Sequence, residues 1–235
     1  GNHSIKYGTL ASPDAMRWLW TGYPAKVQKG WSNNGMQQEI LIAGEDWQEV
    51  ELPVEIGSKD IFATADSSVV FASHMNVYKV SADGNCEQVG KLKSGERLLG
   101  EHLTARGSTL YKKGVKVADG LSGLQAVQEL DGGKYLALCD DQAKCQNNVW
   151  VISVGCRSLA IAPDYRFCVT AEPNTHHLIS TVVDKSGNML YSEAFYYLHD
   201  LSNGAQQMAG NMAFDTKGNL YVATGMGVQV ADHNG

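Results

Sequence analysis

Two short stretches carry side chains whose types and spacing could do chemistry. His102 follows Glu101 near the expected end of an inner strand, so its imidazole is a candidate for lining a pocket, with a structural histidine as the alternative. Cys156 precedes Arg157, and a neighbouring guanidinium favours the reactive thiolate form of a cysteine. The sequence offers no general base for Cys156, so this candidate nucleophile lacks a partner.

A third candidate is the adjacent pair His176 and His177. Neighbouring residues on a strand point to opposite faces, so these two imidazoles cannot readily chelate one metal ion. We expect them to lie in a loop or at a strand end. The chain has neither a phosphate-binding loop nor a Gly-x-Ser-x-Gly nucleophile motif, and we interpret Gly225–Gly227 as a hairpin turn.

The cysteine pattern does not indicate a metal site. Five cysteines occur, none of them in a Cys-x-x-Cys pair and none near a histidine, so zinc is not predicted. Cys139 and Cys145 flank a short loop, where either a hairpin disulfide or two free, partly buried thiols would fit. An odd count leaves at least one thiol unpaired within the monomer.

Composition and charge exclude some classes of partner. The chain has 235 residues and a net charge of −6, and its Lys and Arg residues are scattered, so we expect no nucleic-acid partner. The longest apolar candidate, Val149–Gly155, has the length of a strand, and we expect no membrane span. The first residue is Gly1 rather than Met, which is compatible with removal of an export signal and leaves the compartment open.

The elements that must position these residues are short β-strands. In Asn211–Gly235, apolar residues alternate with polar ones between turns rich in Gly, Asn and Asp, which predicts consecutive hairpins. Three such strands cannot bury a core alone, so the pattern predicts copies elsewhere. Leu10–Asp14 matches Ile161–Asp164, and Gly107–Tyr111 matches Gly218–Tyr221.

Six copies of about 40 residues each predict an all-β fold, a six-bladed β-propeller in one domain, with a β-sandwich as the alternative. Gln38–Ala43 is one of the predicted strands. The last copy shows three strands, so we expect the N-terminal segment to complete the ring beside it. The copies lie near residues 4–38, 39–90, 91–118, 119–154, 155–200 and 205–235.

The segment GNLYVATGMGVQV resembles the senescence marker protein/gluconolactonase family of calcium-dependent lactonases. Leu159–Leu198 is similar to the penultimate section of that family, and Gly44–Thr64 to its first blade. Ser4–Lys29 looks like the closing blade, so the blade order would be rotated. The resemblance implies a calcium or other divalent ion at the mouth of the channel, which would polarise a lactone carbonyl and activate a water.

Most metal-ligand positions of the family are occupied by other residue types in this sequence. Glu51 occupies a metal-ligand position, while the other three positions fall at Leu124, Arg157 and Gly210. Arg157 would repel a cation, so we predict a weak or absent metal site and an ion pair between Arg157 and Glu51. The residues expected to gather at the channel mouth are Glu51, Glu101, His102, Gln125, Arg157 and Asn211.

Two functions remain open at this point. The first is a gluconolactonase-like hydrolase acting on a sugar lactone. The second is a non-catalytic propeller that binds a carbohydrate, a sugar acid or a protein partner. The fold supports both, because propellers host enzymes and binding modules alike.

Overall fold

The structure, a computed structural model, divides the chain into two compact units, Gly1–Glu51 and Leu52–Gly235. Among the described residues, no helix is long and apolar enough to cross a membrane. The residues described are 12–13, 15–18, 21, 35–57, 61–140, 149–153, 156, 158–172, 175–184, 188–199 and 209–232.

The first unit contains a short helix, α2 (Gly35–Gln38), and turns follow it over the residues where the sequence pattern predicts a strand. The prediction of a strand over Gln38–Ala43 is wrong. The carbonyl of Gln37 accepts the backbone N–H groups of Ile40 and Leu41 at 3.0 and 2.8 Å, so local turns satisfy these backbone groups. A short apolar run fits a turn as well as a strand, and periodicity alone does not separate them.

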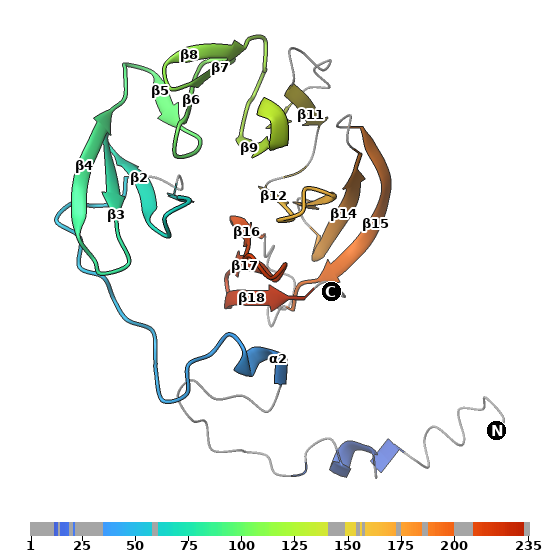
Figure 1. Cartoon of the computed structure of the whole chain (residues 1–235). Coiled ribbons are helices and arrows are strands. Elements are labelled where there is room, and N and C mark those ends of the chain that lie inside the picture. Colours follow the sequence, from blue (N-terminus) through green and yellow to red (C-terminus); the bar gives the residue numbers. More distant parts are fainter. Residues whose placement is uncertain are drawn as a thin grey trace. The chain divides into compact units, whose positions relative to one another are not determined.

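The second unit consists of five sheets, each built from strands that are consecutive in the chain. Figure 1 shows these sheets following one another around a common centre, with β12 and β16 near it and β15 away from it. The first sheet contains β1 (Ile61–Ala63), β2 (Val69–Ser73), β3 (Asn76–Val80) and β4 (Cys86–Lys91). The second contains β5 (Glu96–Leu98), β6 (Leu103–Arg106), β7 (Thr109–Lys112) and β8 (Val115–Ala118).

The remaining three sheets include one that departs from the simple up-and-down order. In the third sheet β10 is antiparallel to β9 but parallel to β11. The third sheet contains β9 (Ala126–Leu130), β10 (Lys134–Cys139) and β11 (Val149–Ser153), with the short helix η1 (Asp131–Gly133) between its first two strands. The fourth contains β12 (Ser158–Ile161), β13 (Phe167–Ala171), β14 (His177–Val183) and β15 (Met189–Tyr197). The fifth contains β16 (Met212–Phe214), β17 (Leu220–Thr224) and β18 (Gly227–Ala231).

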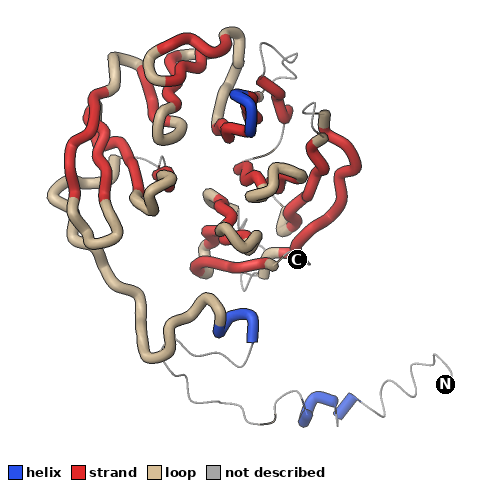
Figure 2. Tube along the Cα trace, in the orientation of Figure 1, coloured by secondary structure: helices blue, strands red, loops and turns tan. Residues whose placement is uncertain are grey.

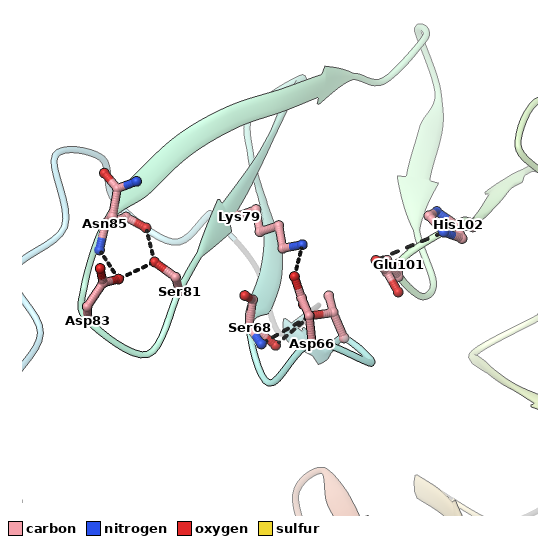
Figure 3. A network of polar contacts seen from close by, with 9 residues as sticks. Asp66, Ser68, Lys79, Ser81, Asp83, Asn85, Glu101 and His102 are labelled. Atoms are coloured by element: carbon pink, nitrogen blue, oxygen red, sulfur yellow. Dashed lines mark hydrogen bonds and ion pairs between the residues drawn. The ribbon is translucent and has the colours of Figure 1, made fainter.

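Short loops join many of these strands, as Figure 2 shows, and four of the turns are closed by the same backbone hydrogen bond. In each, the first N–H donates to the carbonyl of the fifth residue: Thr64 to Ser68 at 2.9 Å, Ser81 to Asn85 at 3.0 Å, Asp184 to Asn188 at 3.0 Å and Asp215 to Asn219 at 2.9 Å. Polar side chains support the first two turns, where Asp66 accepts a hydrogen bond from Lys79 and Asp83 from Ser81 (Figure 3). Polar residues at these positions therefore end one strand and start the next.

Buried side chains join each sheet to the next one along the chain. Leu98 of the second sheet packs with Val70 of the first, and Leu110 of the second packs in one cluster with Val149 of the third. Leu136 and Cys168 belong to a cluster between the third and fourth sheets, and a further cluster joins the fourth to the fifth. Each fully buried leucine stabilises the fold by about 1.5–3 kcal/mol, so these interfaces form the core.

The first strand of every sheet, namely β1, β5, β9, β12 and β16, supplies residues to the walls of two central cavities. This arrangement is that of an all-β propeller, and the prediction of this fold class is confirmed. The predicted number of blades is not confirmed, because the described residues form five sheets, two of them with three strands. In the segment expected to be the sixth blade, residues 12–13, 15–18 and 35–38 are helical.

The physical reason for this difference lies in Ser12-Pro13-Asp14. Its similarity to Ala162-Pro163-Asp164, which connects β12 to β13, predicts a turn between strands. A serine followed by a proline is also a favourable start for a helix, since Pro fits the first helical turn without losing a needed N–H group. Ser12 and Pro13 are helical here. The same local pattern thus serves two structures.

We expect Asp215→Ala to lower the free energy of unfolding by about 1–2 kcal/mol at neutral pH. The Asp215 carboxylate accepts hydrogen bonds from the backbone N–H groups of Lys217 and Asn219, each at 2.9 Å, and from the side chains of Asn219 and Tyr221. Urea denaturation measures the loss. Asp164→Ala is the control, because the exposed Asp164 accepts the backbone N–H of Arg166.

The loss of unfolding free energy in Asp215→Ala should depend on pH. Burial raises the pKa of Asp215, but the hydrogen bonds from Asn219 outweigh burial and leave the pKa below its ordinary value of 3.8. The ionised carboxylate is therefore the stabilising form, and its contribution is lost as the pH falls below 3.8 through the lowered pKa. A cost that stays constant down to pH 2 would contradict this assignment.

Candidate functional site

The candidate site is a cavity of about 460 Å³ at the centre of the second unit. Its apolar walls include Phe62, Leu99 and Met212 from three different sheets. Three of its polar side chains lie at or just before the start of an inner strand, and two lie within a strand. These residues are Arg97, Gln125, Gln128, Ser158 and Asn211.

Arg97 brings a fixed positive charge to this cavity. It lies in the middle of β5 and is half-buried. Its Nη1 donates a hydrogen bond of 3.4 Å to the backbone carbonyl of Gln125, which precedes β9. The guanidinium therefore reaches from the second sheet to the third, and its remaining N–H groups can meet an anion in the cavity.

Gln125 is itself held by a carboxylate. Its Nε2 donates a hydrogen bond of 2.6 Å to Oδ1 of Asp140, and its backbone N–H donates to the carbonyl of Leu138 at 2.7 Å. The backbone N–H of Asp140 in turn donates to Ser122 at 3.1 Å. These contacts fix Asp140 beside the cavity and leave the amide oxygen of Gln125 as an acceptor.

Gly123 makes room for this carboxylate. Its φ of +61° is a left-handed conformation, and a Cβ atom there would lie 1.9 Å from Oδ2 of Asp140. Any side chain at this position would both strain the backbone and displace Asp140. A glycine is therefore required for the local geometry of this wall.

Ser158 and Asn211 face the cavity from the fourth and fifth sheets. Ser158 is the first residue of β12, pairs with Ala171 and is only 5% exposed. Asn211 precedes β16, and its carbonyl accepts the N–H of Ala223 at 3.1 Å. Gly210 approaches Ala223 so closely that a Cβ atom would lie 3.2 Å from it, which keeps this end of the strand against β17.

A second cavity of about 390 Å³ lies at the other ends of the inner strands. Glu101, His102 and Glu129 line it, and it shares Ile61, Phe62, Leu99, Val127, Gln128 and Met212 with the first cavity. His102 Nε2 lies 4.0 Å from Glu101 Oε1 in the turn between β5 and β6 (Figure 3). Glu129 forms an ion pair with Lys112.

The structure thus divides the residues predicted to gather at one mouth. Gln125 and Asn211 line the first cavity, whereas Glu101 and His102 line the second. Glu101 lines the second cavity because β5 ends at Leu98, so Glu101 follows the inner strand.

The remaining predicted site residues are Glu51 and Arg157. Glu51 belongs to the first unit and is exposed. Arg157 lies outside the described residues, so its ion pair with Glu51 stays a prediction. Sequence reasoning missed Arg97, Asp140 and Ser158. Arg97 stands between Glu96 and Leu98, so no alternation of apolar and polar residues marks it as inward-facing.

Burial opposes the thiolate form at three of the described cysteines, Cys139, Cys156 and Cys168. Burial raises the pKa of the Cys156 thiol, which opposes the thiolate that a neighbouring arginine was expected to favour. Burial also raises the pKa of Cys139 to about 11 and that of Cys168 to about 12. Cys139 is a free thiol, and Cys145, its expected disulfide partner, lies outside the described residues.

The adjacent histidines pack against an aromatic ring. The ring centroids of His176 and His177 lie 5.3 and 5.0 Å from that of Tyr197 at the end of β15. His177 is the first residue of β14, which agrees with the expected position of the pair at a strand end. Across the part of the chain that is described, no three His, Cys, Asp or Glu side chains converge as metal ligands do.

The donors around the first cavity do not suit the calcium ion that the family resemblance implies. Calcium takes six to eight oxygen ligands, several of them carboxylates. Asp140 accepts a hydrogen bond from the lining residue Gln125, but it is not itself among the described residues that line the cavity. Arg97 adds a positive charge to the same cavity, which opposes a cation.

Comparison with known proteins supports the fold. No protein-family model and no curated protein matches this chain. A gluconolactonase from Xanthomonas campestris is similar in structure, with a TM-score of 0.54 and 12% identity over 75% of this chain and 72% of that one. A luciferin-regenerating enzyme follows at a TM-score of 0.47 and 11% identity over 74% and 71% of the two chains. At these identities the likeness shows the fold alone.

We expect Gly123→Ala to destabilise the protein by about 1–3 kcal/mol more than Gly107→Ala does. Both glycines have a left-handed φ, +61° and +58°, but a Cβ atom at Gly107 would have nothing within 4 Å. The comparison therefore isolates the collision with Asp140 from the backbone strain. Urea denaturation measures both costs, and equal costs would show that the Asp140 carboxylate moves aside freely.

Proposed function

We propose that the first cavity binds a small polyhydroxylated carboxylate, such as a sugar acid, whose carboxylate pairs with Arg97. The observation that carries this proposal is the position of a half-buried guanidinium in a central cavity whose other polar side chains are amides and a hydroxyl. A guanidinium binds a carboxylate through two parallel hydrogen bonds, which are stronger than neutral ones. An anion also compensates the charge that the cavity partly removes from water.

The rest of the wall suits the remainder of such a ligand. The amides of Gln125, Gln128 and Asn211 can donate to and accept from sugar hydroxyls. Phe62 and Met212 provide apolar surface for the carbon-bound faces of the sugar chain. A volume near 460 Å³ lies within the range of about 300–1,000 Å³ that is common for small-molecule sites.

A second candidate function is hydrolysis of a sugar lactone. Its support is the structural likeness to a gluconolactonase, because opening a sugar lactone produces the kind of hydroxy acid that the first proposal places in the cavity. Asp140, at the edge of the cavity, is the described carboxylate that would act as a general base toward water in this case. Both candidate functions place a sugar acid in the cavity. They differ in whether the protein also catalyses the hydrolysis that produces this acid.

We expect wild-type protein to bind D-gluconate more tightly than the uncharged D-glucose, and Arg97→Gln to weaken gluconate binding about 10- to 100-fold. The glutamine keeps a polar side chain but removes the charge and the paired N–H donors. Isothermal titration calorimetry measures both affinities. Arg106→Gln is the control, because Arg106 lies over Tyr111 outside both cavities.

Unchanged gluconate affinity in Arg97→Gln would contradict the proposal. So would equal affinities of the wild type for gluconate and glucose.

We expect calcium to bind no more tightly than about 1 mM, because the described donors resemble the weakest class of calcium site at best. Calorimetric titration with calcium tests this expectation, and a pH-stat assay with D-glucono-1,5-lactone measures turnover in the same samples. Micromolar calcium binding that disappears in Glu51→Gln, together with calcium-dependent turnover, would favour the lactonase. Turnover without calcium that is lost in Asp140→Asn would favour lactone hydrolysis by the carboxylate alone.

A further inference from the structure

We infer that Ser158 determines which ligands the first cavity accepts, through a hydrogen bond between its hydroxyl and a hydroxyl of the ligand. This inference rests on the proposed function, since it names a specificity-determining contact for the same cavity. Ser158 is 5% exposed and lines the cavity from the start of β12. Its Oγ has no hydrogen-bond partner among the described residues.

This property separates Ser158 from other buried hydroxyl residues of the propeller. Thr64 Oγ1 donates to the carbonyl of Ser68 at 3.0 Å, and Thr181 Oγ1 lies 2.8 Å from Ser192 Oγ. Ser73, also 5% exposed, has its Oγ 3.5 Å from Nδ1 of His74. Each of these hydroxyls has a polar partner within the protein, whereas the hydroxyl of Ser158 has none among the described residues.

A buried hydroxyl without a partner weakens a fold, because the group has lost its hydrogen bonds to water. An alanine at this position would keep the backbone pairing with Ala171 and the small volume of the side chain. The hydroxyl therefore contributes nothing to the packing of β12. A ligand that enters the cavity gives it a partner.

The position of Ser158 also sets the length of the ligand. Arg97 belongs to the second sheet and Ser158 to the fourth, and the residues of the third sheet that line the cavity lie between these sheets in chain order. A ligand that meets both side chains must carry a hydroxyl well removed from its carboxylate. A simple carboxylate meets only Arg97. The contact with Ser158 thus selects a sugar acid over a short, unsubstituted acid.

The test compares wild type, Ser158→Ala and the matched control Ser73→Ala, which removes an equally buried hydroxyl outside both cavities. Calorimetry measures affinity for D-gluconate and for propionate, a carboxylate without hydroxyls, and a thermal melt of the free protein measures stability. We expect Ser158→Ala to bind gluconate about ten-fold more weakly and propionate as the wild type does. Its melting temperature should equal or exceed that of the wild type.

The control should bind gluconate as the wild type does. If Ser158→Ala keeps the wild-type affinity for gluconate while Arg97→Gln loses it, the proposed function stands and the role of Ser158 is overturned. A melting temperature of Ser158→Ala below that of Ser73→Ala would show a structural hydroxyl and would also overturn it. If the wild type binds neither gluconate nor propionate, the proposed function fails and the role of Ser158 fails with it.

Discussion

The packing of each sheet against the next is the interaction on which the rest of this propeller depends. A sheet of three or four short strands is marginal alone, because its apolar faces stay in water. Along β10, Tyr135 and Ala137 pack toward the second sheet, while Leu136 and Leu138 pack toward the fourth. The two-residue period of a strand thus serves two interfaces at once, and each sheet is stabilised by both of its neighbours.

This packing determines where polar side chains can meet. Stacked in sequence, the sheets place their first strands around a common centre, so residues in and beside these strands line shared cavities. Arg97 and Gln125 meet for this reason, although they belong to different sheets. Glu101, only a few residues beyond Arg97, falls in the other cavity. The two cavities consequently differ in charge, one with a guanidinium and the other with carboxylates.

The likeness to a gluconolactonase and the chemistry of the first cavity carry different information. The likeness shows that the sheets of the two proteins stack in the same way. A propeller scaffold of this kind serves many unrelated functions. The chemistry depends on a few side chains at the strand starts. A guanidinium and amides around one cavity favour an anionic, hydroxylated ligand over a cation. Under the proposed function, the cavity of this propeller takes an anion, whereas the family resemblance implies a calcium cation.

The sequence by itself determined the individual strands, because alternation of apolar residues and the residues of tight turns are local signals. The consecutive hairpins predicted for Asn211–Gly235 correspond to the antiparallel strands β16, β17 and β18. The starts of inner strands were located well enough to select Gln125 and Asn211, which line one cavity. The short polar strand β5, with Arg97 in it, carries no such local signal and was missed.

Only the tertiary structure decided the number of described sheets, the parallel pairing of β10 with β11, and the meeting of Arg97, Gln125 and Ser158. Each of these depends on contacts between segments far apart in the chain, whose energies exceed the local preferences of any one segment. Ser158 shows this most clearly. Its sequence neighbours cannot reveal whether its hydroxyl has a partner, since the residues that bury it lie on other strands and other sheets.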